Sequence, residues 1–211
     1  MLAWPTQARR DSVQGVRSLL LGSLLAASIL PGCHPRAATP EVPPAPALCQ
    51  PPPATGDHQH DFDFEFGRWT AKLSRRLRPL TGSNEWVAYE GTSVVHPLWQ
   101  GRSNVGELDV SGPAGHVEGL TLRLYDPSAR RWTVRFANSR DGDLTPGLVG
   151  GFTDGRGEFM DQEVMDGKPI CVRFVFSDMT RDTFRFEQAF SADEGRTWEV
   201  NWVSTFTRVG P

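Results

Sequence analysis

The feature of this 211-residue chain that most restricts its fold is a long series of short stretches in which apolar and polar residues alternate. The series begins near Phe62 and continues to the C-terminus, and each stretch ends in a glycine, aspartate or proline turn signal. Alternation with a period of two is typical of strands with one buried face, because successive side chains point to opposite sides of a sheet. No stretch carries a long helical period, so we expect about nine or ten short strands.

A long meander of hairpins with one apolar face must hide that face, and closing the sheet on itself also removes its two free edges. We therefore expect an all-β fold: a single antiparallel up-and-down β-barrel of about nine or ten strands over residues 61–211. A jelly roll is the alternative architecture. It needs long crossover connections, whereas the sequence shows only short turns.

Several stretches resemble the lipocalin, or calycin, superfamily of β-barrels. "FGRWTAKL" contains the Gly-x-Trp that opens the first strand of those barrels. The resemblance implies that Trp69 closes one barrel end under a basic residue of the last strand, here Arg208, in a cation–π contact. "EFGRWTAK", "GLTLRLYDPSARRW" and "EQAFSADEGRTWEVNW" are also similar to a group of small bacterial lipocalin-like domains without an established activity. The resemblance therefore implies a fold and no function.

The first 60 residues are expected to serve export and tethering. An apolar run, 18–30, follows three arginines and is too short to span a bilayer comfortably, as in a signal peptide. "LPGC", residues 30–33, resembles a bacterial lipobox, which implies cleavage of the signal peptide 1–32 and a lipid on Cys33. An ordinary secretory signal cut nearby is the alternative. Residues 33–60 are rich in proline, and we expect them to form an extended linker.

Two cysteines remain once Cys33 is set aside, namely Cys49 and Cys171. An even number in an oxidising compartment favours a disulfide. Cys171 alternates with the apolar residues of "PICVRFVFS" and should face outward, where the linker can reach it. Two free thiols are an equally open alternative. The expected location is the bacterial cell envelope, facing the periplasm in a Gram-negative organism, with the lipid as the contact to the membrane.

Charge and motifs exclude several classes of function. The formal net charge is −3 without a basic patch, which argues against a nucleic-acid partner. The sequence contains no P-loop, Rossmann fingerprint or Gly-x-Ser-x-Gly elbow. "DHQHD", residues 57–61, supplies two histidines, but a transition-metal site needs three or four positioned ligands. We therefore expect a solvated segment there, and we predict neither a metal nor a cofactor.

Polar residues on otherwise apolar strand faces are the candidates for a binding site. In the last hairpin, pairing Phe190 with Trp198 puts Gln188 on an aromatic inner face. In the hairpin around Asp126-Pro127, pairing Leu124 with Trp132 defines the apolar face in the same way. The residues predicted to line the interior are Arg75, Trp86, Glu90, Asn104, Glu118, Asn138, Gln188 and Trp202.

An aromatic interior with a few polar groups is the usual make-up of a small-molecule pocket. We therefore expect an exported lipoprotein whose barrel binds a small, partly apolar molecule. Two alternatives stay open. One is a cofactor-independent hydrolase or isomerase that uses Glu90 or Glu118 as a general acid/base of raised pKa. The other is a structural envelope protein whose barrel is filled by its own side chains, in which the inner polar groups form a salt-bridge network.

Overall fold

The computed structural model describes residues 49–51 and 56–209. The predicted signal peptide, Cys33 and most of the linker lie outside the described residues. Ten strands make up the fold: β1 (Gly67–Arg76), β2 (Trp86–Leu98), β3 (Ser103–Gly112), β4 (Gly115–Asp126), β5 (Arg131–Asn138), β6 (Leu148–Thr153), β7 (Arg156–Met165), β8 (Lys168–Ser177), β9 (Thr183–Ser191) and β10 (Glu199–Arg208). Two short 3-10 helices, η1 (Asp63–Glu65) and η2 (Trp99–Gly101), precede β1 and β3. No helix in the described ranges is long and apolar enough to cross a bilayer.

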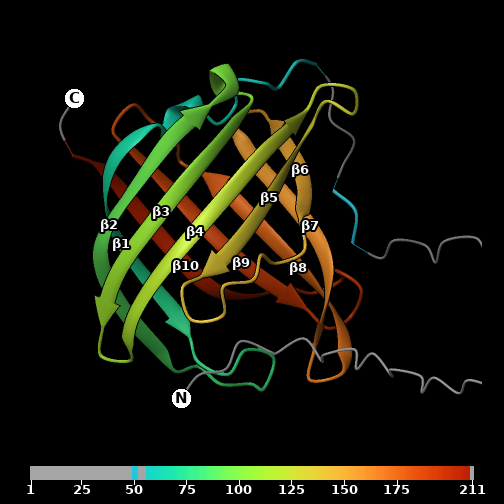
Figure 1. Cartoon of the computed structure of the whole chain (residues 1–211). Coiled ribbons are helices and arrows are strands. Elements are labelled where there is room, and N and C mark those ends of the chain that lie inside the picture. Colours follow the sequence, from blue (N-terminus) through green and yellow to red (C-terminus); the bar gives the residue numbers. More distant parts are fainter. Residues whose placement is uncertain (1–48, 52–55, 210–211) are drawn as a thin grey trace, which may run out of the picture. The chain divides into compact units, whose positions relative to one another are not determined.

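The strands form one closed antiparallel barrel (Figure 1). Each strand pairs with the next along the chain, and β10 returns to pair with β1, where Trp69 stands opposite Arg208. The predicted all-β up-and-down barrel is confirmed, and the described strands do not cross over as in a jelly roll. Closure satisfies the backbone groups that an open meander would leave unpaired at its edges.

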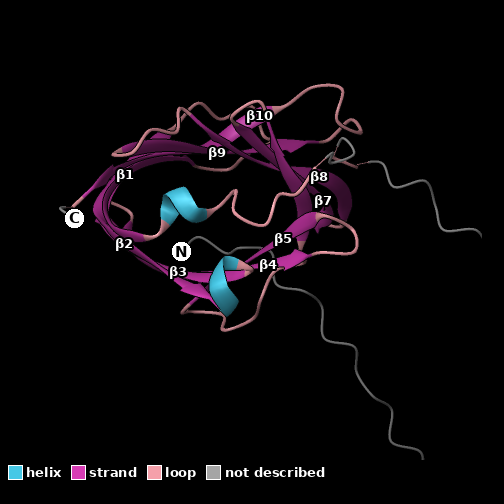
Figure 2. Ribbon diagram, turned by 90° about the horizontal axis from the view of Figure 1, so that it is seen from above, coloured by secondary structure: helices cyan, strands magenta, loops and turns pink. Residues whose placement is uncertain are grey.

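One end of the barrel is closed by η1, which lies inside the ring of strands when the barrel is seen from above (Figure 2). We call this the plugged end. Trp69 is fully buried there, and its indole N–H donates to the carbonyl of Glu65 at 2.7 Å. The Arg208 guanidinium lies 4.1 Å above the indole ring and donates to the carbonyls of Phe64 and Phe66 at 2.8 and 2.7 Å. The Trp69–Arg208 contact implied by the resemblance is confirmed.

Aromatic rings fill the interior next to the plug. Phe62, which is fully buried, packs edge-on against Trp132, Phe152 and Phe176 with ring centroids 5.0–5.3 Å apart. Phe159 stacks on the same ring at 5.5 Å. Such pairs add to the free energy gained by burying large apolar surfaces. Phe62, which lies in the segment before β1, is thus part of the hydrophobic core.

Two glycines on the inner face allow the sheet to bend sharply. A Cβ added to Gly91 on β2 would overlap the backbone of Asp109 on β3, and one added to Gly150 on β6 would overlap the backbone of Glu158 on β7. Neighbouring backbones approach this closely at barrel corners, where only glycine fits. These positions therefore fix where the wall turns.

Cys49 and Cys171 form a disulfide, which resolves the alternative left open by the sequence. Their Cα atoms are 5.6 Å apart, within the usual range for a disulfide. Cys171 lies on β8 between the core residues Ile170 and Val172 and so faces the outside of the barrel, as the alternation indicated. The bond ties the segment that precedes the barrel to its outer wall.

The register between β4 and β5 differs by one residue from the prediction. Tyr125, not Leu124, stands opposite Trp132, because the turn after Asp126 contains four residues and the sequence reading allowed three. A shift of one residue moves every side chain to the other face of a strand. The leucines of β4 therefore face outward, and Leu120 is 41% exposed.

The last hairpin also differs from the predicted register. Glu199, not Trp198, stands opposite Phe190, which is a shift of one residue. A β-bulge at Asn201 then adds a second extra residue to β10. The two shifts add up to a full period of two residues, so Trp202 keeps the inner face on which it was predicted. Gln188 faces the interior as predicted, because it alternates with Phe186 and Phe190 on β9.

Candidate functional site

Two of the residues predicted to line the interior lie on the outer wall of β2. Trp86 is 37% exposed, and the Glu90 carboxylate is 71% exposed with the ammonium of Lys72 at 3.7 Å. The prediction that they face inward is wrong, because both faces of this stretch carry apolar residues. Val87 and Tyr89 are the residues that pack into the core. Glu90 therefore cannot act as an interior acid/base.

Glu118 and Asn138 also do not line the interior site. The carboxylate of Glu118 is exposed and accepts a hydrogen bond from the Ser139 hydroxyl at 2.8 Å, so its predicted inward position is wrong for the register reason given above. Asn138 ends β5 and shapes the turn that follows. Its amide oxygen accepts the N–H groups of Arg140 and Asp141 at 2.9 and 3.2 Å, and its amide nitrogen donates to the Asp141 carboxylate at 2.7 Å.

Asn104 faces the interior as predicted, within a buried polar cluster near the plugged end. Arg123 donates to the Asn104 amide oxygen at 2.8 Å and pairs with the Glu65 carboxylate at 2.8 Å. Burial raises the pKa of Glu65, and the guanidinium of Arg123 opposes this rise. Because Glu65 belongs to η1 and Arg123 to β4, the ion pair fastens the plug to the barrel wall.

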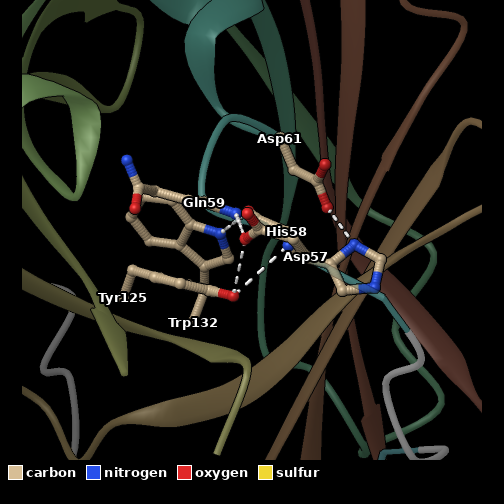
Figure 3. Close-up of polar contacts among 6 residues, drawn as sticks. All are labelled: Asp57, His58, Gln59, Asp61, Tyr125 and Trp132. Atoms are coloured by element: carbon tan, nitrogen blue, oxygen red, sulfur yellow. Dashed lines mark hydrogen bonds and ion pairs between the residues drawn. The ribbon is translucent and has the colours of Figure 1, made fainter. Parts of the chain in front are cut away.

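The "DHQHD" segment is bound to the same end through Tyr125 and Trp132 (Figure 3), and only part of it is fully exposed, since His58, Gln59 and Asp61 are half-buried. The indole N–H of Trp132 donates to the carbonyl of His58 at 2.7 Å, and the imidazole of His58 contacts the Asp61 carboxylate at 2.6 Å. The Tyr125 hydroxyl donates to Asp57 at 3.2 Å and accepts the His58 N–H at 3.3 Å. No group of three metal-ligating side chains gathers in the described part of the chain. These contacts hold the segment in place.

The opposite end of the barrel has a different polar set on its inner wall. We call it the mouth end; β1, β7 and β9 end there. The Gln188 amide nitrogen donates to the Asn201 amide oxygen at 2.8 Å, and both side chains are buried. The bulge directs Asn201 inward beside Trp202, since the two residues at a bulge share one face. The amide nitrogen of Asn201 is buried and has no hydrogen-bond partner within the described residues.

Asn201 is not among the residues that the sequence predicted to line the interior. It alternates with Glu199 and Val203, and nothing in a single sequence marks the bulge. The predicted inward position of Trp202 is supported by its packing against the core cluster. Its indole N–H donates to the Ser204 hydroxyl at 2.7 Å.

Arg75 lies on the inner face near the end of β1, directly opposite Trp202 in the sheet. Its guanidinium carbon is 6.0 Å from the centroid of the indole ring. Burial lowers the pKa of Arg75, and a hydrogen bond with the Tyr89 side chain opposes this effect. Tyr89 on β2 is itself buried. The mouth end thus holds a partly desolvated cation against two aromatic side chains.

Two carboxyl groups on β7 complete the inner wall at this end, and sequence reasoning missed them. Asp161 and Glu163 alternate with the core residue Phe159, so they point inward, and they stand opposite the buried apolar residues Val172 and Ile170 of β8. Burial raises the pKa of Asp161. Burial, followed by the charge of Asp161, raises the pKa of Glu163 to about 7. The signal available in the sequence was this alternation with Phe159.

A recess of about 330 Å³ opens at the mouth end. The loop between β1 and β2 forms one side, held by Glu199, whose carboxylate accepts the Leu80 N–H at 2.7 Å and lies 3.3 Å from the Arg76 guanidinium. The recess is lined by Leu80, Gly82, Phe190, Ala192, Asp193, Thr197, Trp198 and Glu199. Phe190 belongs to the inner face of β9, two residues beyond Gln188, so the recess adjoins the end of the strand that carries this amide.

No protein-family model and no curated protein matches this chain. Among solved structures, the S-type phycobiliprotein lyase CPES from Guillardia theta is 12% identical with a TM-score of 0.48, covering 72% of this chain and 93% of that one. A redesigned β-barrel bound to DFHBI is 9% identical with a TM-score of 0.39, covering 69% and 99%. A de novo designed fluorescence-activating β-barrel is 14% identical with a TM-score of 0.34, covering 70% and 95%. No function is carried over from similarities this low.

Proposed function

We propose that this protein is an exported, lipid-anchored protein of the bacterial envelope, and that its barrel binds a small, partly apolar molecule on the inner wall at the mouth end. The observation that carries the binding proposal is the buried amide nitrogen of Asn201, which no described residue satisfies. It stands beside Gln188 and Trp202, on a wall that also carries the aromatic residues Phe186 and Phe190.

The cost of the unpaired amide of Asn201 supports a bound partner at the mouth end. A buried hydrogen-bond donor without a partner costs about 1–3 kcal/mol. At the plugged end Arg123 satisfies the amide oxygen of Asn104, while the amide nitrogen of Asn104 likewise has no hydrogen-bond partner within the described residues. At the mouth end the amide pair of Gln188 and Asn201 also leaves one N–H₂ group without a partner, and there a recess of about 330 Å³ opens beside the same pair of strands. A ligand or water that carries an acceptor would satisfy it, and apolar walls around a few polar groups suit a ligand.

Native mass spectrometry of the purified barrel tests the proposal. We expect a co-purified molecule, or binding of an apolar fluorescent probe, in the unaltered protein. The double variant Gln188→Leu/Asn201→Leu removes both partners of the amide pair, so stability should hold or rise while binding is lost. Glu90→Gln, on the outer wall, is the matched control and should bind normally. A double variant that is less stable but binds as before would contradict the proposal and favour a structural role.

The proposed location in the bacterial envelope is supported by a pattern in the sequence and by the disulfide. The leader, "LPGC" and the proline-rich linker have the order found in lipoprotein precursors. The Cys49–Cys171 disulfide suits an oxidising compartment such as the periplasm, since disulfides seldom persist in the cytosol. Membrane fractionation of a Cys33→Ser variant tests the anchor directly.

A further inference from the structure

We propose that the ligand of this barrel carries two polar groups at opposite ends of an apolar body: an anionic or acceptor group held by Asn201 and Arg75, and a basic amine held by Asp161 and Glu163. This inference rests on the proposed function and names the chemical class of the ligand.

The first half of the site offers hydrogen-bond donors. The free amide nitrogen of Asn201 can only donate, and a guanidinium such as that of Arg75 has donors and no acceptor. Both are inner-wall groups on the paired strands β1 and β10, since Arg75 stands opposite the residue that follows Asn201. A carboxylate suits this set best, because charge-assisted bonds from a guanidinium are stronger than neutral ones.

The second half of the site offers acceptors. Asp161 and Glu163 are alternate residues of β7 and point to the same side, so their charges repel each other. In the described part of the chain, no cationic side chain lies within ion-pair distance of either carboxyl, and no side chain donates a hydrogen bond to Glu163. An ammonium group would relieve the repulsion and provide the missing donors.

The two halves lie at the same end of the barrel but on different parts of the wall. Arg75 is the penultimate residue of β1, Asn201 is the third of β10, and Glu163 is two residues from the end of β7, all at the mouth end. Strands β10, β9 and β8 separate β1 from β7, so four steps of about 4.8 Å place the two strands roughly 19 Å apart along the wall. Because the side chains of both halves point inward, the span between their polar atoms across the barrel is shorter than this distance along the wall. Adjacent amino and carboxyl groups cannot serve both halves, whereas groups separated by an apolar chain can.

Three eight-carbon probes and one isomer test this geometry by calorimetry or ligand-observed NMR: octanoic acid, octylamine, 8-aminooctanoic acid and 2-aminooctanoic acid. We expect 8-aminooctanoic acid to bind at least tenfold more tightly than any of the other three. Glu163→Gln should reduce its affinity to that of octanoic acid and leave octanoic acid binding unchanged. Arg75→Gln should reduce it to that of octylamine, and circular dichroism spectra should show that both variants remain folded.

Two results would overturn the inference. The first is equal affinity for 8-aminooctanoic acid and octanoic acid, which would show that the β7 carboxyls take no part. The second is equal affinity for the two amino acid isomers, which would remove the argument from distance. Loss of binding in the Gln188→Leu/Asn201→Leu variant would still support the proposed function in both cases, so the two proposals fail separately.

Discussion

Replacing Glu163 by glutamine should stabilise the barrel at alkaline pH and leave its stability unchanged in acid. Burial raises the pKa of this carboxyl from 4.5 to about 7. Between these values the folded protein holds a proton that the unfolded chain has lost, so the free energy of unfolding falls as pH rises. A pKa difference of one corresponds to about 1.36 kcal/mol, which gives about 3 kcal/mol at most above pH 7. Because the side chain is partly exposed, we expect a gain of about 1–2 kcal/mol.

The surroundings of Glu163 make this prediction specific. Strand β8 presents the apolar residues Ile170 and Val172 to this part of the wall, and Asp161 is the one charge that contributes to the raised pKa. Arg135 contributes to the pKa of Asp161 and not to that of Glu163. Glutamine keeps the size of the side chain and removes the charge that is disfavoured by burial.

Urea unfolding followed by tryptophan fluorescence measures the effect, with the disulfide intact. The free energy of unfolding of Glu163→Gln minus that of the unaltered protein should be near zero at pH 4.5 and about 1–2 kcal/mol at pH 8. Glu90→Gln, on the exposed outer wall, should show no pH-dependent difference. A difference that stays constant with pH, or a variant that is less stable at pH 8, would refute the reasoning, because it would mean that the carboxylate is stabilised in the folded protein.

Four further changes test other parts of the structure. Trp69→Ala should lower the free energy of unfolding by about 3–5 kcal/mol, and a loss below 1 kcal/mol in urea titrations would show that the indole does not hold the plugged end. Arg123→Met should destabilise by about 3–5 kcal/mol at pH 8, because Glu65 loses its counter-charge, and by less near pH 4, where Glu65 takes up a proton; an effect independent of pH would argue against the ion pair. Cys171→Ser should lower the melting temperature, since a disulfide contributes about 2–4 kcal/mol, and an unchanged melting temperature under oxidising conditions would count against the bond. Cys33→Ser should move the protein from the membrane to the soluble fraction, and unchanged fractionation would exclude the lipid anchor.

The strands, their order and the closure of the barrel could be predicted because they depend on local patterns. Alternation with a period of two marks each strand, and glycine, aspartate and proline mark the turns. A meander of about ten strands must bury its apolar face, and closing the sheet into a barrel does this and also removes the two free edges. The contact of Trp69 with Arg208 followed from a short motif and the position of the last strand.

The site could be predicted only in part, because its residues depend on register. Arg75 and Gln188 face the interior as expected, since each continues a strand face defined by neighbours two residues away. Asn104 also faces the interior, although the residues around it in the sequence do not define the two faces of its strand. Glu118 lies outside because one turn has an extra residue, and Glu90 lies outside because both faces of its strand are apolar enough to be buried. Because side chains alternate with a period of two, an error of one residue in the register assigns every side chain of the strand to the wrong face.

The sequence by itself determined that the chain makes short antiparallel strands which must close, and that its first residues have the pattern of an export signal. Only the tertiary structure decided which polar groups meet inside. The bulge turns Asn201 toward Gln188, and Asp161 and Glu163 on β7 share one end of the barrel with Arg75 on β1. Strand formation depends on residues a few positions apart in the sequence. The contacts between inner polar side chains depend instead on backbone pairing between distant segments, and a single extra residue in one pairing changes which side chains face the interior.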